Sequence, residues 1–277
     1  AYTTTVDASG NWTVDVAGSD LAADTEFDVL VTSNDTAGNT VESKITSEHR
    51  VDVLSAEITS DITDATNSGL TTDTITNDAT PDITGVTEAG ASVTITYTDK
   101  DGQEHTTGAV TADANGVYTI AITNELAEGS NSLTVKATDT AGNEATITQD
   151  VTVDTSHPTI SIDADLAGDD VINATEKGQP LTISGTTNNV ENGQVVSVTI
   201  DGKTYTGEVQ NNVWSLVVPA ADVANFEEGL EGITADVSDV AGNAATQATS
   251  SIEVDTEAFA SIDVDRITSD SIINSEE

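Results

Sequence analysis

The chain has 277 residues, of which 36% are hydrophobic, and it carries 49 acidic residues against 7 basic ones, a formal net charge of -42. A surface this negative repels nucleic acid and anionic lipid, so neither is expected as a partner, and it attracts divalent cations instead. Adaptation of the whole surface to high salt is an alternative explanation for the same imbalance. The composition therefore leaves cation binding and salt adaptation open.

The apolar residues alternate with polar ones in short runs, as in Ser92-Val93-Thr94-Ile95-Thr96-Tyr97. This period of two predicts strands with one buried face rather than a disordered chain. The chain has no cysteine, so core packing or metal binding has to stabilise the fold without disulfides. It also has no apolar run long enough to insert into a membrane.

One turn, Asp-x-Ala-Gly-Asn, occurs three times, beginning at Asp35, Asp139 and Asp239, at intervals of 104 and 100 residues. Two further markers keep the same order around it, which establishes an internal repeat. They are an aromatic residue after an earlier turn, at Trp12, Tyr118 and Trp214, and a later strand that ends in Val-Asp, at Asp52, Asp154 and Asp255.

The markers predict the domain boundaries. Residues 1–52 are expected to be the C-terminal half of one repeat, 53–154 and 155–255 two complete repeats, and 256–277 the start of a fourth. Within 53–154 we predict seven strands, which in about 100 residues is typical of an immunoglobulin-like β-sandwich. The predicted strands lie near Glu57–Ile62, Pro81–Thr87, Ser92–Thr98, Glu104–Thr111, Val117–Thr123, Ser132–Thr138 and Ala145–Val153.

The fold class is therefore all-β, a linear array of tandem Ig-like sandwiches. Residues 219–223 and 124–126 are compatible with single helical turns. The three marker aromatics are predicted to be core residues of a central strand, and carbohydrate stacking is the alternative.

Acidic side chains concentrate where one predicted repeat follows another, and a pattern Asp-x-(Ile/Val)-(Ile/Thr)-Asn recurs at each junction. Seven basic residues cannot neutralise them, whereas calcium binds about six to eight oxygen ligands in flexible loops. The predicted ligands are Asp52, Asp61, Asp73, Asn77, Asp78 and Asp139 at the first junction, Asp154, Asp163, Asp165, Asp169, Asp170, Asn173, Glu176 and Asp239 at the second, and Asp255, Asp263, Asp265, Asp270, Asn274 and Glu277 at the third.

The Asp-x-Ala-Gly-Asn turn should connect the last two strands of a repeat and so lie beside the incoming linker. Asp139 is then expected to face the linker acids 52–78, and Asp239 those of 154–176, so that calcium fixes the angle between neighbours. Two simpler interpretations stay open. The turn aspartate can accept hydrogen bonds from its own backbone without metal, and exposed linker acids can merely solubilise a surface.

No catalytic arrangement is evident. His49, His105 and His157 occupy non-equivalent positions of different repeats, and neither a nucleophile elbow nor a phosphate-binding glycine loop occurs. Carboxylates clustered at every junction are unlike the single pair that a glycosidase places in a cleft. We therefore expect a protein without enzymatic activity.

The turn with its Val-Asp strand end, the stretch from Asp78 to Val93 and the stretch from Asp170 to Gly185 resemble the repeats of giant type I-secreted bacterial adhesins, which are built from bacterial Ig-like domains. The resemblance implies an extracellular, cell-surface array that calcium makes rigid. Such an array projects an adhesive domain for attachment to a host cell or abiotic surface and for biofilm formation. It also implies export without a cleaved N-terminal signal.

Calcium and the neighbouring repeats of the same chain are the partners expected for such an extender. The alternative is that the repeats themselves bind a glycan, a receptor, ice or another surface ligand, which a flat threonine array or a row of exposed aromatics would favour.

Overall fold

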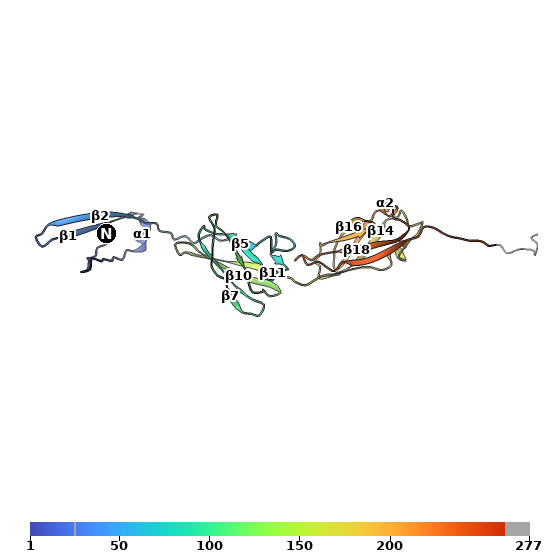
Figure 1. Cartoon of the computed structure of the whole chain (residues 1–277), viewed down its shortest axis with the longest axis horizontal. Helices are drawn as coiled ribbons and strands as arrows, with labels where there is room; N and C mark the ends of the chain where they lie inside the picture. The colour runs from blue at the N-terminus through green and yellow to red at the C-terminus, as the bar shows by residue number, and fades with distance from the viewer. Residues whose placement is uncertain (25, 264–277) are drawn as a thin grey trace, which may run out of the picture.

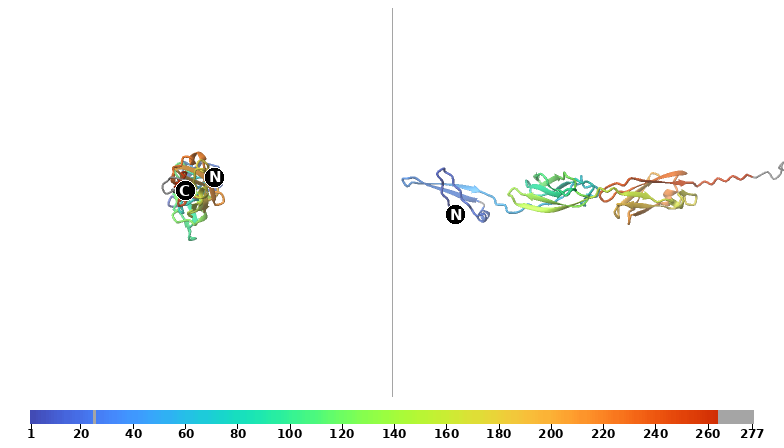
Figure 2. Two further views of the ribbon diagram at one scale, coloured as in Figure 1. Left: turned by 90° about the vertical axis from the view of Figure 1, so that its right-hand side faces the viewer. Right: turned by 90° about the horizontal axis from the view of Figure 1, so that it is seen from below.

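The computed structural model describes residues 1–24 and 26–263. Three β-structured parts follow one another in chain order along the long axis of the molecule (Figures 1 and 2). The first part contains α1 (Gly18–Ala23) and a hairpin of β1 (Glu26–Asn34) and β2 (Thr40–Glu48), whose side chains are mostly exposed.

The second part, the central sandwich, comprises β3 to β11. One sheet has the order β4-β11-β10-β6-β7, with β8 also paired to β6, and the other has the order β3-β5-β9. The strands are β3 (Asp61–Ile62), β4 (Ile75–Thr76), β5 (Asp82–Val86), β6 (Ser92–Thr98), β7 (Glu104–Thr106), β8 (Val110–Thr111), β9 (Val117–Ala121), β10 (Gly129–Thr138) and β11 (Glu144–Val153).

The third part, the distal sandwich, repeats this topology, with the sheets β13-β19-β18-β15-β16 and β12-β14-β17. Its elements are β12 (Thr159–Ile162), the short 3-10 helix η1 (Leu166–Gly168), β13 (Val171–Ile172), β14 (Leu181–Asn188), β15 (Val195–Ile200), β16 (Lys203–Glu208), β17 (Val213–Val218), α2 (Ala220–Val223), β18 (Gly229–Asp236) and β19 (Ala248–Val254).

Alternating side chains build a separate core in each sandwich. In β6, for example, Val93, Ile95 and Tyr97 are buried while the intervening residues are more exposed. The central core contains only side chains of residues 56–153, and the distal core contains only those of residues 160–254, with Ile160 and Ile162 half-buried at its edge. Each sandwich therefore has the hydrophobic core that an independent domain requires.

The predicted core aromatics are confirmed in both sandwiches, where Tyr118 and Trp214 are each 2% exposed. Each lies directly across the sheet from a glycine, Gly85 for Tyr118 and Gly185 for Trp214, which leaves room for the ring. The prediction is wrong for Trp12, the third marker aromatic, which is 43% exposed because residues 11–17 form no strand that would carry it into a core.

The strand predictions for 53–154 need three corrections. The predicted strand 57–62 is shortened to the two residues of β3, Asp61–Ile62. The predicted strand 104–111 is divided into β7 and β8, because the chain leaves the sheet between them. The two-residue strand β4 was not predicted, since a segment this short has no period to recognise. The single helical turn expected near residues 219–223 is confirmed as α2, whereas residues 124–126 form no helix.

We call the end of a sandwich where the linker arrives its entry end, and the end where β11 or β19 leaves its exit end. The turn at Asp139 joins β10 to β11 and the turn at Asp239 joins β18 to β19, as predicted. The parallel pairs β4–β11 and β13–β19 involve the last residues of β11 and β19. The segments that carry β4 and β13 therefore lie at the exit ends.

Candidate metal centre

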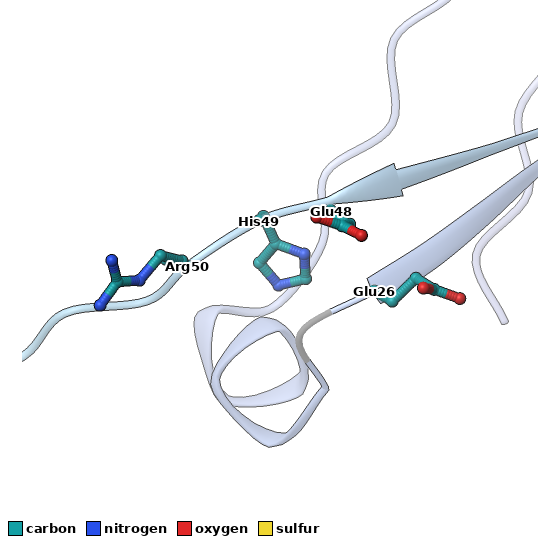
Figure 3. A pocket seen from close by; sticks show the side chains of 4 residues that line it. All are labelled: Glu26, Glu48, His49 and Arg50. Carbon is teal, nitrogen blue, oxygen red and sulfur yellow. The ribbon is translucent and has the colours of Figure 1, made fainter.

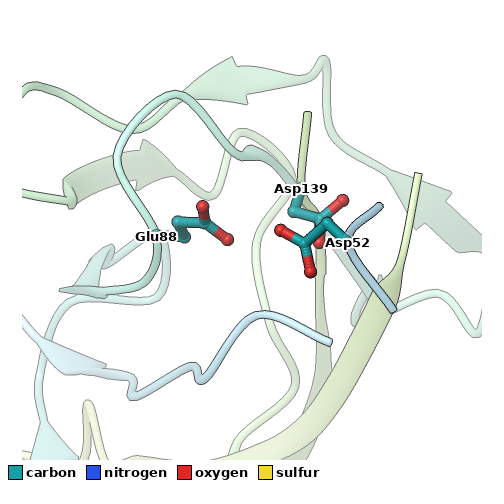
Figure 4. A group of neighbouring side chains, drawn as sticks. All are labelled: Asp52, Glu88 and Asp139. Carbon is teal, nitrogen blue, oxygen red and sulfur yellow. The ribbon is translucent and has the colours of Figure 1, made fainter. Parts of the chain in front are cut away.

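Three carboxylates meet at the entry end of the central sandwich. Asp52 comes from the incoming linker, Glu88 from the turn between β5 and β6, and Asp139 from the turn between β10 and β11. One carboxylate oxygen from each lies within 4.8 Å of the other two, and Figure 4 shows the three side chains around a common space. In the described part of the chain, this is the one group of three acidic, histidine or cysteine side chains that meet so closely.

Local hydrogen bonds fix the Asp139 carboxylate. Oδ1 accepts from the backbone N–H groups of Ala141 and Asn143, both at 2.8 Å, and Oδ2 accepts from Asn143 Nδ2 at 2.8 Å. The same Nδ2 donates to the carbonyl oxygen of Asp52 at 3.2 Å, which ties the linker to the turn. The hydrogen bond from the Asn143 side chain is the main cause that lowers the pKa of Asp139 below its ordinary value. Asp139 is therefore held ionised and oriented.

An equivalent set of residues occurs at the entry end of the distal sandwich. Asn243 Nδ2 donates to the carbonyl oxygen of Asp154 at 2.8 Å and to Asp239 Oδ2 at 2.9 Å. Glu191, in the turn between β14 and β15, accepts from the backbone N–H of Val240 at 2.9 Å. The distal sandwich thus takes one carboxylate from the incoming linker and two from the equivalent turns, with Asp154, Glu191 and Asp239 corresponding to Asp52, Glu88 and Asp139.

Electrostatics differ between the two copies. Asp239 is only 3% exposed, and burial raises its pKa above the ordinary value, with the negative charges of Asp154 and Glu191 adding to the rise. A buried carboxylate beside two others is costly unless a cation lies among them. The three distal carboxylates therefore repel one another, but their oxygens do not come within the 4.8 Å that encloses the central group.

The spacing of the central group suits calcium. Calcium–oxygen bonds are about 2.3–2.6 Å long, so two oxygens on one ion are at most about 5 Å apart. The 4.8 Å limit that encloses the oxygens of Asp52, Glu88 and Asp139 satisfies this condition. The donor set, all carboxylate oxygen without histidine or cysteine, is the one that hard cations prefer.

A family model for the bacterial Ig-like domain matches residues 54–155. Along 91% of its length the chain is 30% identical to a solved structure of a 1.5-MDa bacterial ice-binding adhesin, described in terms of its retention at the host cell surface, and covers 82% of that structure, with a TM-score of 0.40. The chain belongs to the bacterial Ig-like domain family.

Other solved structures support this assignment. This bacterial Ig-like chain is 35% identical to a Ca2+-stabilized adhesin that helps an Antarctic bacterium bind ice, with 99% of this chain and 68% of that one covered and a TM-score of 0.39. A bacterial Ig-like domain of the M. primoryensis ice-binding adhesin is 33% identical, with 36% of this chain and 99% of that domain covered and a TM-score of 0.29. No curated protein matches the chain.

The comparisons confirm the predicted fold class and the resemblance to repeats of large bacterial adhesins. The matched structures named above are all described as adhesins or as domains of one.

One part of the predicted ligand arrangement is wrong for both Ig-like sandwiches. The acids near β4 and β13 do not face the Asp139 and Asp239 turns of their own sandwich, because β4 and β13 pair with the exit ends of β11 and β19. Asp154 N, for example, donates to the Thr76 carbonyl oxygen at 2.9 Å. The displaced residues are Asp73, Asn77 and Asp78 in the central sandwich and Asp169, Asp170, Asn173 and Glu176 in the distal one.

Several of these displaced side chains accept hydrogen bonds from nearby backbone. Asp78 Oδ1 accepts from Thr80 N at 2.8 Å, Asp170 Oδ1 from Leu166 N at 2.8 Å, and Glu176 Oε2 from Asn173 N at 3.1 Å. They act as turn and helix-end acceptors, which is the simpler interpretation of such residues.

The other predicted ligands are more scattered. Asp61 Oδ1 accepts from Ile62 N, and Asp163 Oδ2 accepts from Ser184 Oγ at 2.7 Å. Asp165 adopts a left-handed backbone conformation before η1 and is exposed, as are Asp255 and Asp263. The remaining predicted ligands, Asp265, Asp270, Asn274 and Glu277, lie outside the described residues.

Sequence reasoning missed Glu88 and Glu191, which lie 36 and 37 residues after Asp52 and Asp154. Their nearly constant distance from the Val-Asp marker was the available signal. It also missed Glu128, which accepts hydrogen bonds from Thr155 N and Ser156 Oγ, and Glu228, which accepts from Thr256 N. These two glutamates hold the first residues that leave each sandwich.

A shallow hollow near the end of the β1–β2 hairpin is lined by Glu26, Glu48, His49 and Arg50 (Figure 3). His49 Nε2 donates to the Leu21 carbonyl oxygen at 2.9 Å, so this ring nitrogen is used in a hydrogen bond between the hairpin and α1.

Within the ranges 1–24 and 26–263, no helix combines the length and the apolar character needed to cross a lipid bilayer.

Proposed function

We propose that this chain is an extender segment of a large cell-surface adhesin, in which calcium bound at the entry end of each sandwich stiffens the array. The observation that carries the proposal is the carboxylate group Asp52, Glu88 and Asp139, with its counterpart Asp154, Glu191 and Asp239. Both groups take one member from the linker and two from the sandwich that follows.

This arrangement couples an ion to the orientation of a domain. A calcium ion on Asp52, Glu88 and Asp139 would join the linker to two turns of one rigid sandwich. The linker would lose its rotational freedom because its carboxylate and the Asp52 carbonyl would both be held at the Asp139 turn. Since relative domain motion is the default where interfaces are small, the ion would convert a hinge into a fixed angle.

The location and biology follow from the same proposal. Calcium concentrations that saturate exposed carboxylate sites are extracellular, which places the working array outside the cell. The matched ice-binding adhesins include one described as calcium-stabilised and one described by its retention at the cell surface. By analogy, other domains of the same protein would contact the host-cell or abiotic surface, and attachment, biofilm formation and type I secretion belong to this proposal.

Small-angle X-ray scattering of this chain tests the proposal. Profiles are recorded in millimolar calcium and in excess EGTA, with potassium chloride used to keep ionic strength equal. We expect a larger maximum dimension and a narrower distribution of shapes in calcium. Identical profiles in both buffers, with a further change only on raising potassium chloride, would support the salt-adaptation interpretation and refute the calcium mechanism.

A further inference from the structure

The central and distal sandwiches touch directly at a point that contains no carboxylate. Ser68, in the loop between β3 and β4, donates from Oγ to the carbonyl oxygen of Ala241 at 2.5 Å. Ala241 lies in the Asp239 turn of the distal sandwich and is fully buried. The loop stands at the exit end of one sandwich and the turn at the entry end of the next.

Two glycines allow the backbones to meet. A Cβ on Gly69 would lie 2.2 Å from the carbonyl oxygen of Val240, and a Cβ on Gly242 would lie 2.7 Å from Gly69 N. Both glycines have positive φ angles, +77° and +86°, which other residues adopt only with strain. A side chain at either position would hold the two sandwiches apart.

The loop is organised before it meets its neighbour. Ser68 Oγ accepts from Asn77 N at 2.7 Å, and Asn67 Nδ2 donates to the Asp73 carbonyl oxygen at 2.8 Å. Thr76 Oγ1 donates to the Thr66 carbonyl oxygen at 2.6 Å. Because these bonds lie within the central sandwich, the loop loses little further conformational entropy when it docks on the distal sandwich.

We propose that Ser68 and Gly69 form a metal-independent joint that docks on the Ala-Gly pair of the following turn and keeps the two sandwiches aligned without calcium. The partner that fits this surface is a turn with alanine and glycine at its third and fourth positions, in the neighbouring repeat. The inference does not rest on the calcium sites, since none of their carboxylates makes the contact.

The joint distinguishes one junction from another. Residues 63–74 connect β3 to β4, whereas the shorter segment 163–170 connects β12 to β13 and has a different sequence. The turn at Asp139 has the same Ala-Gly pair, yet in this structure a Cβ on Gly142 would meet nothing within 4 Å. Gly142 therefore provides a matched control for Gly242, with the same turn and a similar φ angle.

The test uses spin labels, because the absence of native cysteine makes introduced ones unique. Cysteines replace the exposed residues Gln103 and Glu208, one in each sandwich, and pulsed electron paramagnetic resonance measures the distance distribution in EGTA. The distribution is expected to be narrow for the otherwise unchanged chain and for Gly142→Ala. Gly242→Ala should widen it by about twofold, because the sandwiches then regain independent motion.

Calorimetry verifies that both sandwiches of each variant still unfold cooperatively. Ser68→Ala is a second variant, which introduces no strain from a positive φ angle. It is also expected to widen the distance distribution. The proposed joint is refuted if the unchanged chain has a broad distance distribution in EGTA, or if Gly142→Ala and Gly242→Ala give distributions of equal width. A second label pair, Ser43→Cys with Asn115→Cys, reports the first junction. If the distance distribution of this second pair is the same in calcium and in EGTA while the first pair gives the expected widths, the calcium proposal is refuted and the proposed joint is supported.

Discussion

The substitution Glu88→Gln should lower the stability of the central sandwich in calcium but not in EGTA. In EGTA, the substitution removes one of three carboxylates whose oxygens lie within 4.8 Å of one another, and so relieves two of the three repulsive pairs. The apo variant should therefore unfold at or above the temperature of the unchanged protein. In calcium, the same variant lacks a charged ligand and should unfold at a lower temperature.

The size of the calcium effect follows from linkage. Extracellular calcium modules have dissociation constants of about 10⁻⁴ to 10⁻³ M. At free calcium roughly a hundredfold above that constant, one site per sandwich adds about 2.7 kcal/mol, a large share of the 5–15 kcal/mol of a small domain. For a sandwich of about 100 residues, this corresponds to a rise in Tm on the order of 10–20 °C. Glu88→Gln should lose most of that rise.

Differential scanning calorimetry in calcium and in EGTA measures both effects. Glu191→Gln serves as the counterpart in the distal sandwich, so each variant should shift one transition and identify it. Glu104→Gln is the matched control, since it makes the same charge change on an exposed strand of the central sandwich away from the site. If Glu88→Gln gains as much from calcium as Glu104→Gln does, the carboxylate group does not bind the ion.

Three further results are expected. In EGTA, carboxyl NMR should give Asp239 a pKa above the ordinary aspartate value and Asp139 one below it. As the pH falls, the distal sandwich then gains stability as Asp239 takes up its proton, whereas the contribution of Asp139 is lost as the pH passes down through its lowered pKa. Glu128→Gln should increase the amide mobility of the linker after β11 in NMR relaxation, since its carboxylate accepts from that linker, and unchanged relaxation would contradict this role. Gly185→Ala should destabilise the distal sandwich by about 3 kcal/mol or more in urea unfolding, because its Cβ would lie 1.9 Å from a β12 carbonyl oxygen, while Gly232→Ala, in open space, should have little effect.

Local patterns in the sequence were sufficient for the fold class. Alternating apolar residues such as Val93, Ile95 and Tyr97 depend only on the period of a strand, and the structure buries all three. The recurring turns at Asp139 and Asp239 mark equivalent hairpins, and the aromatic residues at 118 and 214 occupy equivalent core positions. Calcium as the candidate ion also followed from acidic clustering and the scarcity of basic residues.

The composition of each site depended on the tertiary structure. Glu88 joins Asp139 only because β5 and β10 both end at the entry end, and neither residue is close to the other in sequence. The acids near β4 and β13 were placed at the wrong end, since nothing local in a two-residue strand shows that it pairs in parallel with the end of β11 or β19.

The contact between Ser68 and Ala241 lies furthest from what the sequence could reveal, because it joins residues 173 positions apart in separate sandwiches. Side-chain periodicity determines which face of a strand is buried, and turn composition determines where the chain reverses. The direction and partner of each strand determine which turns share an end, and the way two finished sandwiches meet determines which glycines must stay glycine. Those last two properties arise from packing over long sequence distances, which is why the repeat was evident from the sequence and the junctions required the structure.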